Sequence, residues 1–170
     1  MPRTGISGIA LLPAPNMGLI IVTNSTAYWE LSDRGDKVRF EPLDSTLPVT
    51  QSGLDNGLDN TKVTVRAGVF HGEFLAEFTI EELEDFKRQL RGLEDDLSAS
   101  TLFEPIEGHL VLRIRGDGRG HFEVECEATP EWSGRQTLTF KCSFDQTELK
   151  NLIRMLDGLM RAFKVDGRAL

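Results

Sequence analysis

Two stretches of the sequence decide the fold, FTIEELEDFKRQLRGL at residues 78–93 and FDQTELKNLIRMLDGL at residues 144–159. Each begins with Phe, continues with a residue that can cap a helix, Thr79 or Asp145, and places Glu three positions after that cap. This is the spacing of a capping box. Apolar residues then recur at intervals of three or four, so each stretch predicts an amphipathic helix with one buried stripe. The two stripes are Ile80, Leu83, Phe86, Leu90, Leu93 and Leu97 in the first helix, and Leu149, Leu152, Ile153, Leu156, Leu159 and Phe163 in the second.

The segments that precede the two helices have the alternation of half-buried strands. Apolar and polar side chains alternate at residues 63–66 and 73–78 before the first helix. Before the second helix they alternate in a hairpin at residues 110–126 and again at residues 138–144. Paired strands ahead of each helix predict an α+β fold of two layers, a mostly antiparallel β-sheet with two amphipathic helices packed on one face.

The length fits one domain, so we expect residues 1–170 to form a single α+β domain. A ββα internal repeat explains the likeness of the two stretches, with halves at residues 62–97 and 109–163; the alternative is a coincidence of two well-capped helices. Residues 44–60 hold proline, several glycines and a tandem GLDN, which predicts a long surface loop. Further short strands are expected at residues 19–22, 27–31 and 38–40, with a turn at Gly35 between the last two.

Composition excludes several classes of partner. The formal net charge is −8 and the pI is about 4.9, so the field of the protein repels nucleic acid and anionic membranes but permits a basic protein partner. The sequence has no apolar run long enough for a transmembrane helix, and we expect a soluble cytoplasmic protein. Cys126 and Cys142 fall on apolar positions of predicted strands, which favours reduced, buried thiols over a disulfide or a metal role.

No motif in the sequence indicates catalysis, a cofactor or a metal. There is no GxSxG nucleophile motif, and His71, His109 and His121 lack the spacing of metal ligands. The glycine-rich residues 116–120 join two predicted strands, so they lack the helix N-terminus that a phosphate loop needs. We therefore expect no catalytic, cofactor-binding or metal-binding residues.

Charge on the first predicted helix is the one remaining functional signal. Acidic residues outnumber basic ones between residues 81 and 96. One interpretation is a solvated helix face with acids near its N-terminus, where the helix dipole favours them. The other is a patch that attracts a basic partner. On that second interpretation Glu81, Glu84, Asp85 and Asp95 are the candidate partner-binding residues, because they avoid the apolar stripe of their helix.

Several segments resemble one family of bacterial proteins. They are GVFHG at residues 68–72, the helix at residues 78–93, EGHLVL at residues 107–112, GHFEV at residues 120–124 and LTFKCSFDQTEL at residues 138–149. Together they are similar to the WapI-type bacterial immunity proteins, named after the wall-associated protein toxin of Gram-positive bacteria. The resemblance implies a cytoplasmic, non-enzymatic immunity protein that binds and neutralises a polymorphic or contact-delivered toxin, often a nuclease.

Two other classes of function stay open at this point. One is a structural or regulatory protein that homodimerises through its sheet, which predicts a dimer whose population depends on concentration. The other is an enzyme whose chemistry none of the known motifs reveals. An acidic inhibitor of a nuclease is physically consistent with the sequence, because proteins that grip phosphate are commonly basic.

Overall fold

The structure is a computed structural model that describes residues 27–43, 57–130 and 136–166. These residues form two four-stranded antiparallel sheets and two helices. The first sheet has the order β1 (Trp29–Asp33), β2 (Asp36–Pro42), β3 (Gly57–Ala67) and β4 (Phe70–Thr79), and is followed by α1 (Ile80–Asp95). The second sheet has the order β5 (Ser100–Phe103), β6 (Leu110–Gly116), β7 (His121–Ala128) and β8 (Leu138–Asp145), and is followed by α2 (Gln146–Asp166). The chain therefore repeats a ββββα unit.

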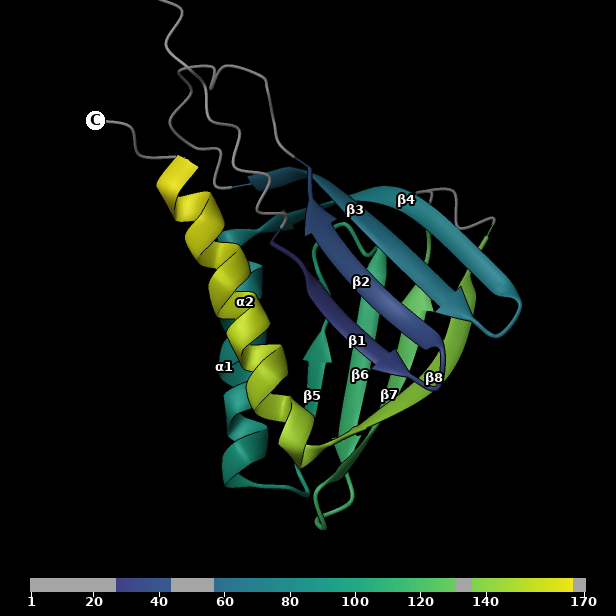
Figure 1. The fold of residues 1–170 in the computed structure, drawn as a ribbon, viewed down its shortest axis with the longest axis vertical. Coiled ribbons are helices and arrows are strands. Elements are labelled where there is room, and N and C mark those ends of the chain that lie inside the picture. Colours follow the sequence, from purple (N-terminus) through teal and green to yellow (C-terminus); the bar gives the residue numbers. More distant parts are fainter. Residues whose placement is uncertain (1–26, 44–56, 131–135, 167–170) are drawn as a thin grey trace, which may run out of the picture.

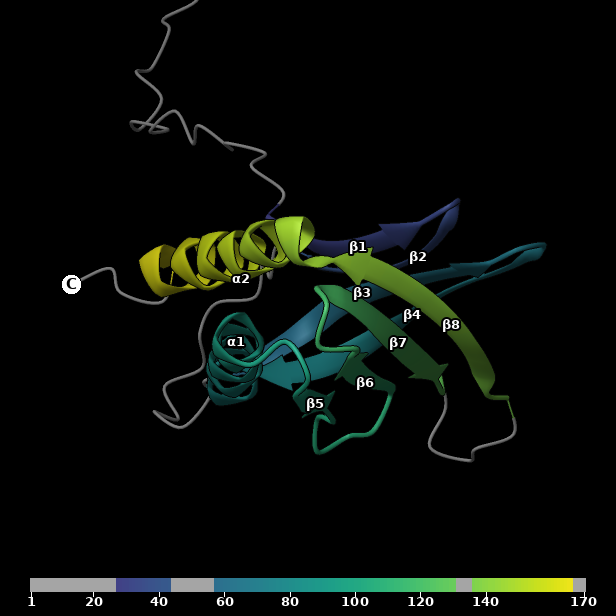
Figure 2. The same ribbon diagram turned by 90° about the horizontal axis from the view of Figure 1, so that it is seen from below.

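The helices lie side by side at one end of the two sheets (Figure 1). Helix α1 contacts β4 and β5, and α2 contacts β1 and β8, so each helix touches both sheets. Seen from below, the two sheets extend away from the helix pair at an angle to each other (Figure 2). This arrangement buries the apolar stripe of each helix and one face of each sheet together.

Aromatic rings join the first sheet, α1 and β5 in the core. Trp29 stacks on Phe40 with ring centroids 4.9 Å apart and meets Phe86 of α1 edge-on at 5.6 Å. Phe103 of β5 packs against Phe86 at 4.6 Å and lies parallel to Phe40 at 6.0 Å. Such ring pairs add a modest stabilisation beyond the area that they bury. Both halves of the chain thus contribute to one continuous hydrophobic cluster.

The predicted fold class is confirmed, and so are the two helices. The capping box is present at α1, where the Glu82 amide donates to the Thr79 hydroxyl oxygen at 3.2 Å and the Thr79 amide donates to the Glu82 carboxylate at 2.7 Å. The predicted stripes are buried or half-buried at every position whose side chain the structure describes; the side chain of Phe163 lies outside that set. The repeat is longer than the predicted ββα halves, because four strands precede each helix.

The strands divide into two sheets at the place where β1 and β8 meet. Asp33, at the end of β1, accepts hydrogen bonds from the backbone N–H of Ser143 at 2.9 Å and from its hydroxyl at 2.8 Å. The outer edge of β8 therefore gives this N–H to a side chain instead of to the backbone of a neighbouring strand. β1 and β8 are not paired as neighbours in one sheet, and this side-chain contact links the edges of the two sheets.

The predicted loop at residues 44–60 was wrong at its C-terminal end. Residues 57–60 belong to β3, where Gly57 pairs with Thr79 and Leu58 with Phe78. The register shifts between Leu58 and Thr61, which indicates a β-bulge. Glycine, Asp and Asn are typical of loops and conceal this irregular strand in the sequence. Residues 44–56 and the predicted strand at residues 19–22 lie outside the described residues.

Neither of the two helices described is both long and apolar enough to span a bilayer.

Candidate partner-binding surface

Helix α1 turns two of its basic side chains toward α2. The ammonium of Lys87 donates a hydrogen bond of 2.8 Å to Asp157, and the guanidinium of Arg91 lies 3.9 Å from the other oxygen of the same carboxylate. The hydrogen bond from Lys87 holds the pKa of Asp157 below its usual range, against the opposing effect of burial, and the charges of Lys87, Arg91 and Arg161 add to the lowering. Both basic groups therefore lie on the side of α1 that faces α2.

The four predicted partner-binding residues lie on the outward side of α1. Residues spaced by three, four or seven positions share a helix face, and Glu81, Glu84, Asp85 and Asp95 follow this spacing opposite the buried stripe. Glu81, Glu84 and Asp95 are exposed, whereas Asp85 is half-buried. The helix thus presents acidic side chains to solvent along its length, and the exposed Arg88, which bonds Asp85, lies among them.

Asp85 is held in place by two neighbours on its own helix. Its carboxylate accepts hydrogen bonds from Arg88 on the next turn and from the Gln89 amide at 2.7 Å. The carbonyl oxygen of Gln89 in turn accepts hydrogen bonds from the hydroxyl of Thr101 and, at 3.1 Å, from the backbone N–H of Leu102. Asp85 is therefore the outer end of a chain of hydrogen bonds that reaches the free edge of β5.

A pocket of about 210 Å³ lies between α1 and β5; we call it the α1–β5 pocket. It is lined by Glu82, Asp85, Phe86 and Gln89 of α1, by Leu102 and Phe103 of β5, and by Glu104 and Pro105. Glu82 also fixes the chain after β5, because its second carboxylate oxygen accepts a hydrogen bond of 2.8 Å from the Ile106 amide. The α1–β5 pocket thus combines carboxylates with apolar side chains.

Two exposed apolar side chains accompany this pocket. Leu102 is 41% exposed and Ile106 is 87% exposed. Apolar groups surrounded by charged ones are typical of the surfaces through which proteins bind each other. The outward side of α1, the α1–β5 pocket and these two side chains form the candidate surface for a partner.

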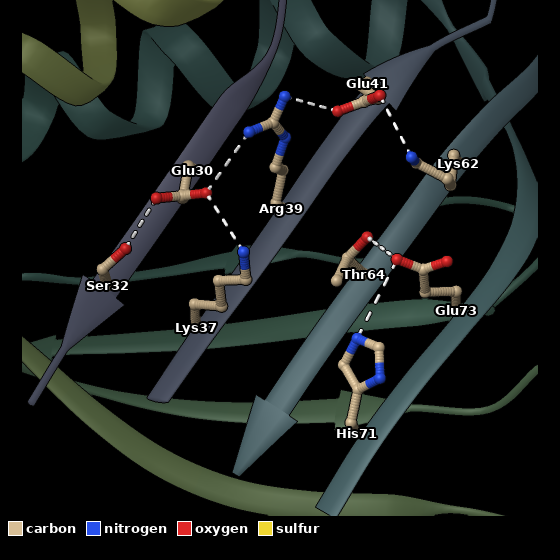
Figure 3. A network of polar contacts seen from close by, with 9 residues as sticks. All are labelled: Glu30, Ser32, Lys37, Arg39, Glu41, Lys62, Thr64, His71 and Glu73. Carbon is tan, nitrogen blue, oxygen red and sulfur yellow. Dashed lines mark hydrogen bonds and ion pairs between the residues drawn. The ribbon is translucent and has the colours of Figure 1, made fainter. Parts of the chain in front are cut away.

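The outer face of the first sheet offers a different kind of polar surface (Figure 3). Glu30 of β1 lies 3.8 Å from Lys37 and 3.7 Å from Arg39, both of β2. Glu41 contacts Arg39 at 2.5 Å and Lys62 at 3.2 Å. Each of these two acids therefore has two basic neighbours on the same or an adjacent strand. With Glu73 of β4, three acids balance the three bases Lys37, Arg39 and Lys62 on this face (Figure 3).

The electrostatics of Glu41 show how well its charge is compensated. Burial alone would raise the pKa of this carboxyl, but the hydrogen bonds and charges of Lys62 and Arg39 outweigh burial and lower it. The guanidinium of Arg39 also lies 3.8 Å from the ring centroid of Tyr28, a cation–π contact. A compensated network of this kind stabilises a sheet face and leaves little net charge to attract a partner.

The structure also places the other candidate groups. Cys126 and Cys142 are free and buried, and burial raises the pKa of Cys126 above its ordinary range and that of Cys142 to about 12. Protonated, buried thiols are poor nucleophiles and poor metal ligands. Within the described residues, no group of three His, Cys, Asp or Glu side chains is arranged to hold a metal ion.

Sequence reasoning missed Leu102, Glu104 and Ile106. They follow α1 in a segment that has little alternation, and they become part of a surface only because β5 folds back against the helix. The weak signal was the apolar pair Leu102 and Phe103 between the polar Thr101 and Glu104, a pattern that is too short to predict a strand.

Comparison with known proteins identifies a family. The structure of the plant transcriptional regulator PBF-2 is similar with a TM-score of 0.44 and 14% sequence identity, covering 82% of this chain and 85% of that chain. A comparison with curated proteins finds no match. The sequence matches the Immunity protein WapI-like family over residues 30–164, which is most of the chain and nearly all of the described fold. The chain therefore belongs to the WapI-like family of immunity proteins, which are typically non-enzymatic and whose role is the neutralisation of toxins.

Proposed function

We propose that this protein neutralises a cognate bacterial toxin by binding it directly, through the outward side of α1 and the α1–β5 pocket. The toxin on this proposal is a basic protein, and a nuclease fits that chemistry because its phosphate-binding surface carries Lys and Arg. The complex forms in the cytoplasm of the cell that is protected. The proposal needs no cofactor and no catalytic residue in this chain.

One observation carries the proposal. Lys87 and Arg91 of α1 are drawn toward Asp157, while Glu81, Glu84 and Asp95 point to solvent on the other side of the helix. The surface thus has a directional charge that the neutral outer face of the first sheet lacks. Opposite charges on two proteins raise the rate at which they meet and select the correct partner.

The α1–β5 pocket adds what charge alone does not supply. The strongest contributions to protein–protein affinity come from a few large side chains that fill desolvated pockets. Leu102 provides an exposed apolar wall above the buried rings of Phe86 and Phe103, and Asp85 and Glu104 provide carboxylates beside it. A Lys or Arg side chain matches both parts of this lining, because its apolar stem ends in a cation. An aromatic side chain flanked by cations matches them as well.

The experiment needs a candidate toxin as the probe, and this is sought among the products of the genes next to the one that encodes this chain. Its affinity is measured for the wild type and for the double variant Glu84→Lys/Asp85→Lys. The matched control, Glu73→Lys/Glu77→Lys, makes the same change of net charge on exposed residues of β4. We expect at least a tenfold loss of affinity for the first variant and a much smaller loss for the control, with Asp95→Lys between them. Equal effects of the two double variants would show that only the net charge matters and would remove α1 as the contact.

A further inference from the structure

The end of the first sheet that lies away from the helices has the opposite character to α1 (Figure 1). Its turns connect β1 to β2 and β3 to β4, and they expose Val69 to 94% and Phe70 to 63%. The basic side chains nearby, those of Arg34, Arg66 and His71, are exposed as well. We call these five residues the hairpin tip. It combines two apolar side chains with cationic or titratable ones on a protein whose net charge is −8.

The hairpin tip is held in place by the acids around it. The amide of Gly68, which has the positive φ of 58° that a tight hairpin turn requires, donates a hydrogen bond of 2.7 Å to Asp36. Asp33 accepts its two hydrogen bonds from Ser143 and lies 3.7 Å from the Arg34 guanidinium. These two acids are thus engaged by the protein itself. Glu73, 3.9 Å from the His71 ring, is the acid beside the tip on β4.

The α1–β5 pocket complements the hairpin tip in both polarity and charge. Its apolar lining is the exposed Leu102 over the buried Phe86, Phe103 and Pro105, and its carboxylates are Glu82, Asp85 and Glu104. A cavity of about 150 Å³ suffices to hold one benzene ring, so a pocket of about 210 Å³ has room for the phenyl ring of Phe70.

We propose that a second copy of this chain inserts its hairpin tip into the α1–β5 pocket. The ring of Phe70 fills the apolar part of the pocket, while Arg34 and Arg66 lie against its carboxylates. The tip and the pocket lie at different ends of one molecule, so the contact is head-to-tail: each copy that donates a tip keeps its own pocket open. Contacts of this type build rings or open chains and do not stop at a symmetric dimer.

The association is weak and sensitive to concentration. The contact buries only a two-residue apolar tip and its surroundings. An interface area of this size is typical of transient complexes. The net charges of the two copies repel each other while the local charges attract. If the proposed function holds, the toxin and the second copy compete for one pocket, and self-association is displaced when the toxin appears.

The test uses full-length protein and two variants that each disable one half of the contact. The tip variant is Val69→Ser/Phe70→Ser, and the pocket variant is Leu102→Ser/Glu104→Lys; all four side chains are exposed, so the core is untouched. Mass is measured by light scattering and sedimentation from about 10 µM to about 1 mM, a range that covers weak contacts. Leu75→Ser, which removes an exposed apolar side chain on β4 outside the hairpin tip, is the control.

The expected results are distinct for each sample. The wild type and the control grow in average mass beyond a dimer as concentration rises, and each double variant stays monomeric alone. An equimolar mixture of the two double variants forms a one-to-one dimer and stops there, because one intact tip meets one intact pocket. That mixture also shows that both variants are folded.

Three results would overturn the proposal: a monomeric wild type throughout, a tip variant that still self-associates, or a mixture that stays monomeric. Toxin binding is measured separately. The tip variant keeps an intact pocket and is expected to bind the toxin as the wild type does, so failure of either proposal is visible without the other.

Discussion

Lys87 of α1 and Asp157 of α2 are joined by a hydrogen bond of 2.8 Å, and this contact holds the Lys87 ammonium away from the outward side of α1. The two side chains come from different halves of the repeat, and Arg91 approaches the same carboxylate. Their side chains are each about a fifth to a third exposed, so the pair is partly shielded from water. The contact both ties the helices together and leaves the outward side of α1 acidic.

Replacing Asp157 with Asn is expected to lower the free energy of unfolding by about 1 kcal/mol at neutral pH, the upper part of the range for such pairs. The pKa of Asp157 is lower in the folded state than its ordinary value. Its contribution is therefore fully present above the unfolded-state pKa of about 4 and is lost as the pH falls through the folded-state pKa.

Urea unfolding of the wild type and of Asp157→Asn at pH 7 and at pH 2.5 measures this directly. The difference between the two proteins is expected at pH 7 and should shrink toward zero in acid. Glu94→Gln, which removes an exposed carboxylate from α1, serves as the control and should match the wild type at pH 7. A difference that is the same at both pH values would show that the carboxylate acts by shape and not by charge.

Asp33 is expected to be a larger determinant of stability than its position at a strand end suggests. It receives both the backbone and the hydroxyl hydrogen bond of Ser143 and so joins the edges of the two sheets. Asp33→Ala leaves the half-buried Ser143 groups without this acceptor, at a cost of about 1 to 3 kcal/mol. Ser32→Ala, one residue away, removes only an exposed hydroxyl that bonds Glu30 and should change stability by less than about 0.5 kcal/mol. Equal unfolding midpoints for the two variants would contradict this role.

The helices and the hairpin between them were predictable because each rests on a local pattern. The α1 capping box is contained in one turn of helix, and the apolar stripe is contained in the helix itself. The alternation in β6 and β7 fixes which side chains face each other, and Arg113 does lie opposite Glu125, with Arg115 opposite Glu123. Of these pairs, Arg113 and Glu125 approach to 3.4 Å.

The features that the sequence conceals depend on contacts between distant segments. Strand β5 has four residues and is held by β6 on one side and by Gln89 of α1 on the other. The two sheets are linked where Asp33 meets Ser143, far along the chain. The α1–β5 pocket needs β5 and therefore could not be foreseen, although Asp85 on its rim could. The periodicity of one segment does not predict contacts between segments that are distant in the sequence.

Association with a basic toxin is expected to depend on salt through its rate. Glu81, Glu84 and Asp95 are exposed on one side of α1, and exposed charges act over a distance that falls from about 10 Å at 0.1 M salt to about 3 Å at 1 M. The association rate with the cognate toxin should fall at least tenfold over that range, with a smaller change in the dissociation rate. Stopped-flow mixing measures both. In Glu81→Lys/Glu84→Lys the salt dependence should be flatter than in Glu73→Lys/Glu77→Lys; identical slopes would place the steering charge elsewhere.

The two buried thiols are expected to report on local opening, and in a fixed order. Burial raises the pKa of both Cys126 and Cys142, the latter to about 12, with the charges of Asp33 and Asp36 as further causes for Cys142. At pH 7.5 both thiols are protonated, so alkylation requires the strands to open. Cys142 lies on β8 at the edge of its sheet and Cys126 on β7 inside it, and edge strands open at a lower cost.

Iodoacetamide labelling followed by peptide mass spectrometry should therefore find Cys142 modified before Cys126. Asp33→Ala releases the edge of β8 and is expected to accelerate labelling of Cys142 more than that of Cys126, while Ser32→Ala should leave both rates unchanged. In guanidinium chloride both thiols should react quickly and at similar rates. Labelling of Cys126 ahead of Cys142 in the native protein would mean that the second sheet opens from its interior strands, which the pairing of β7 on both sides does not allow.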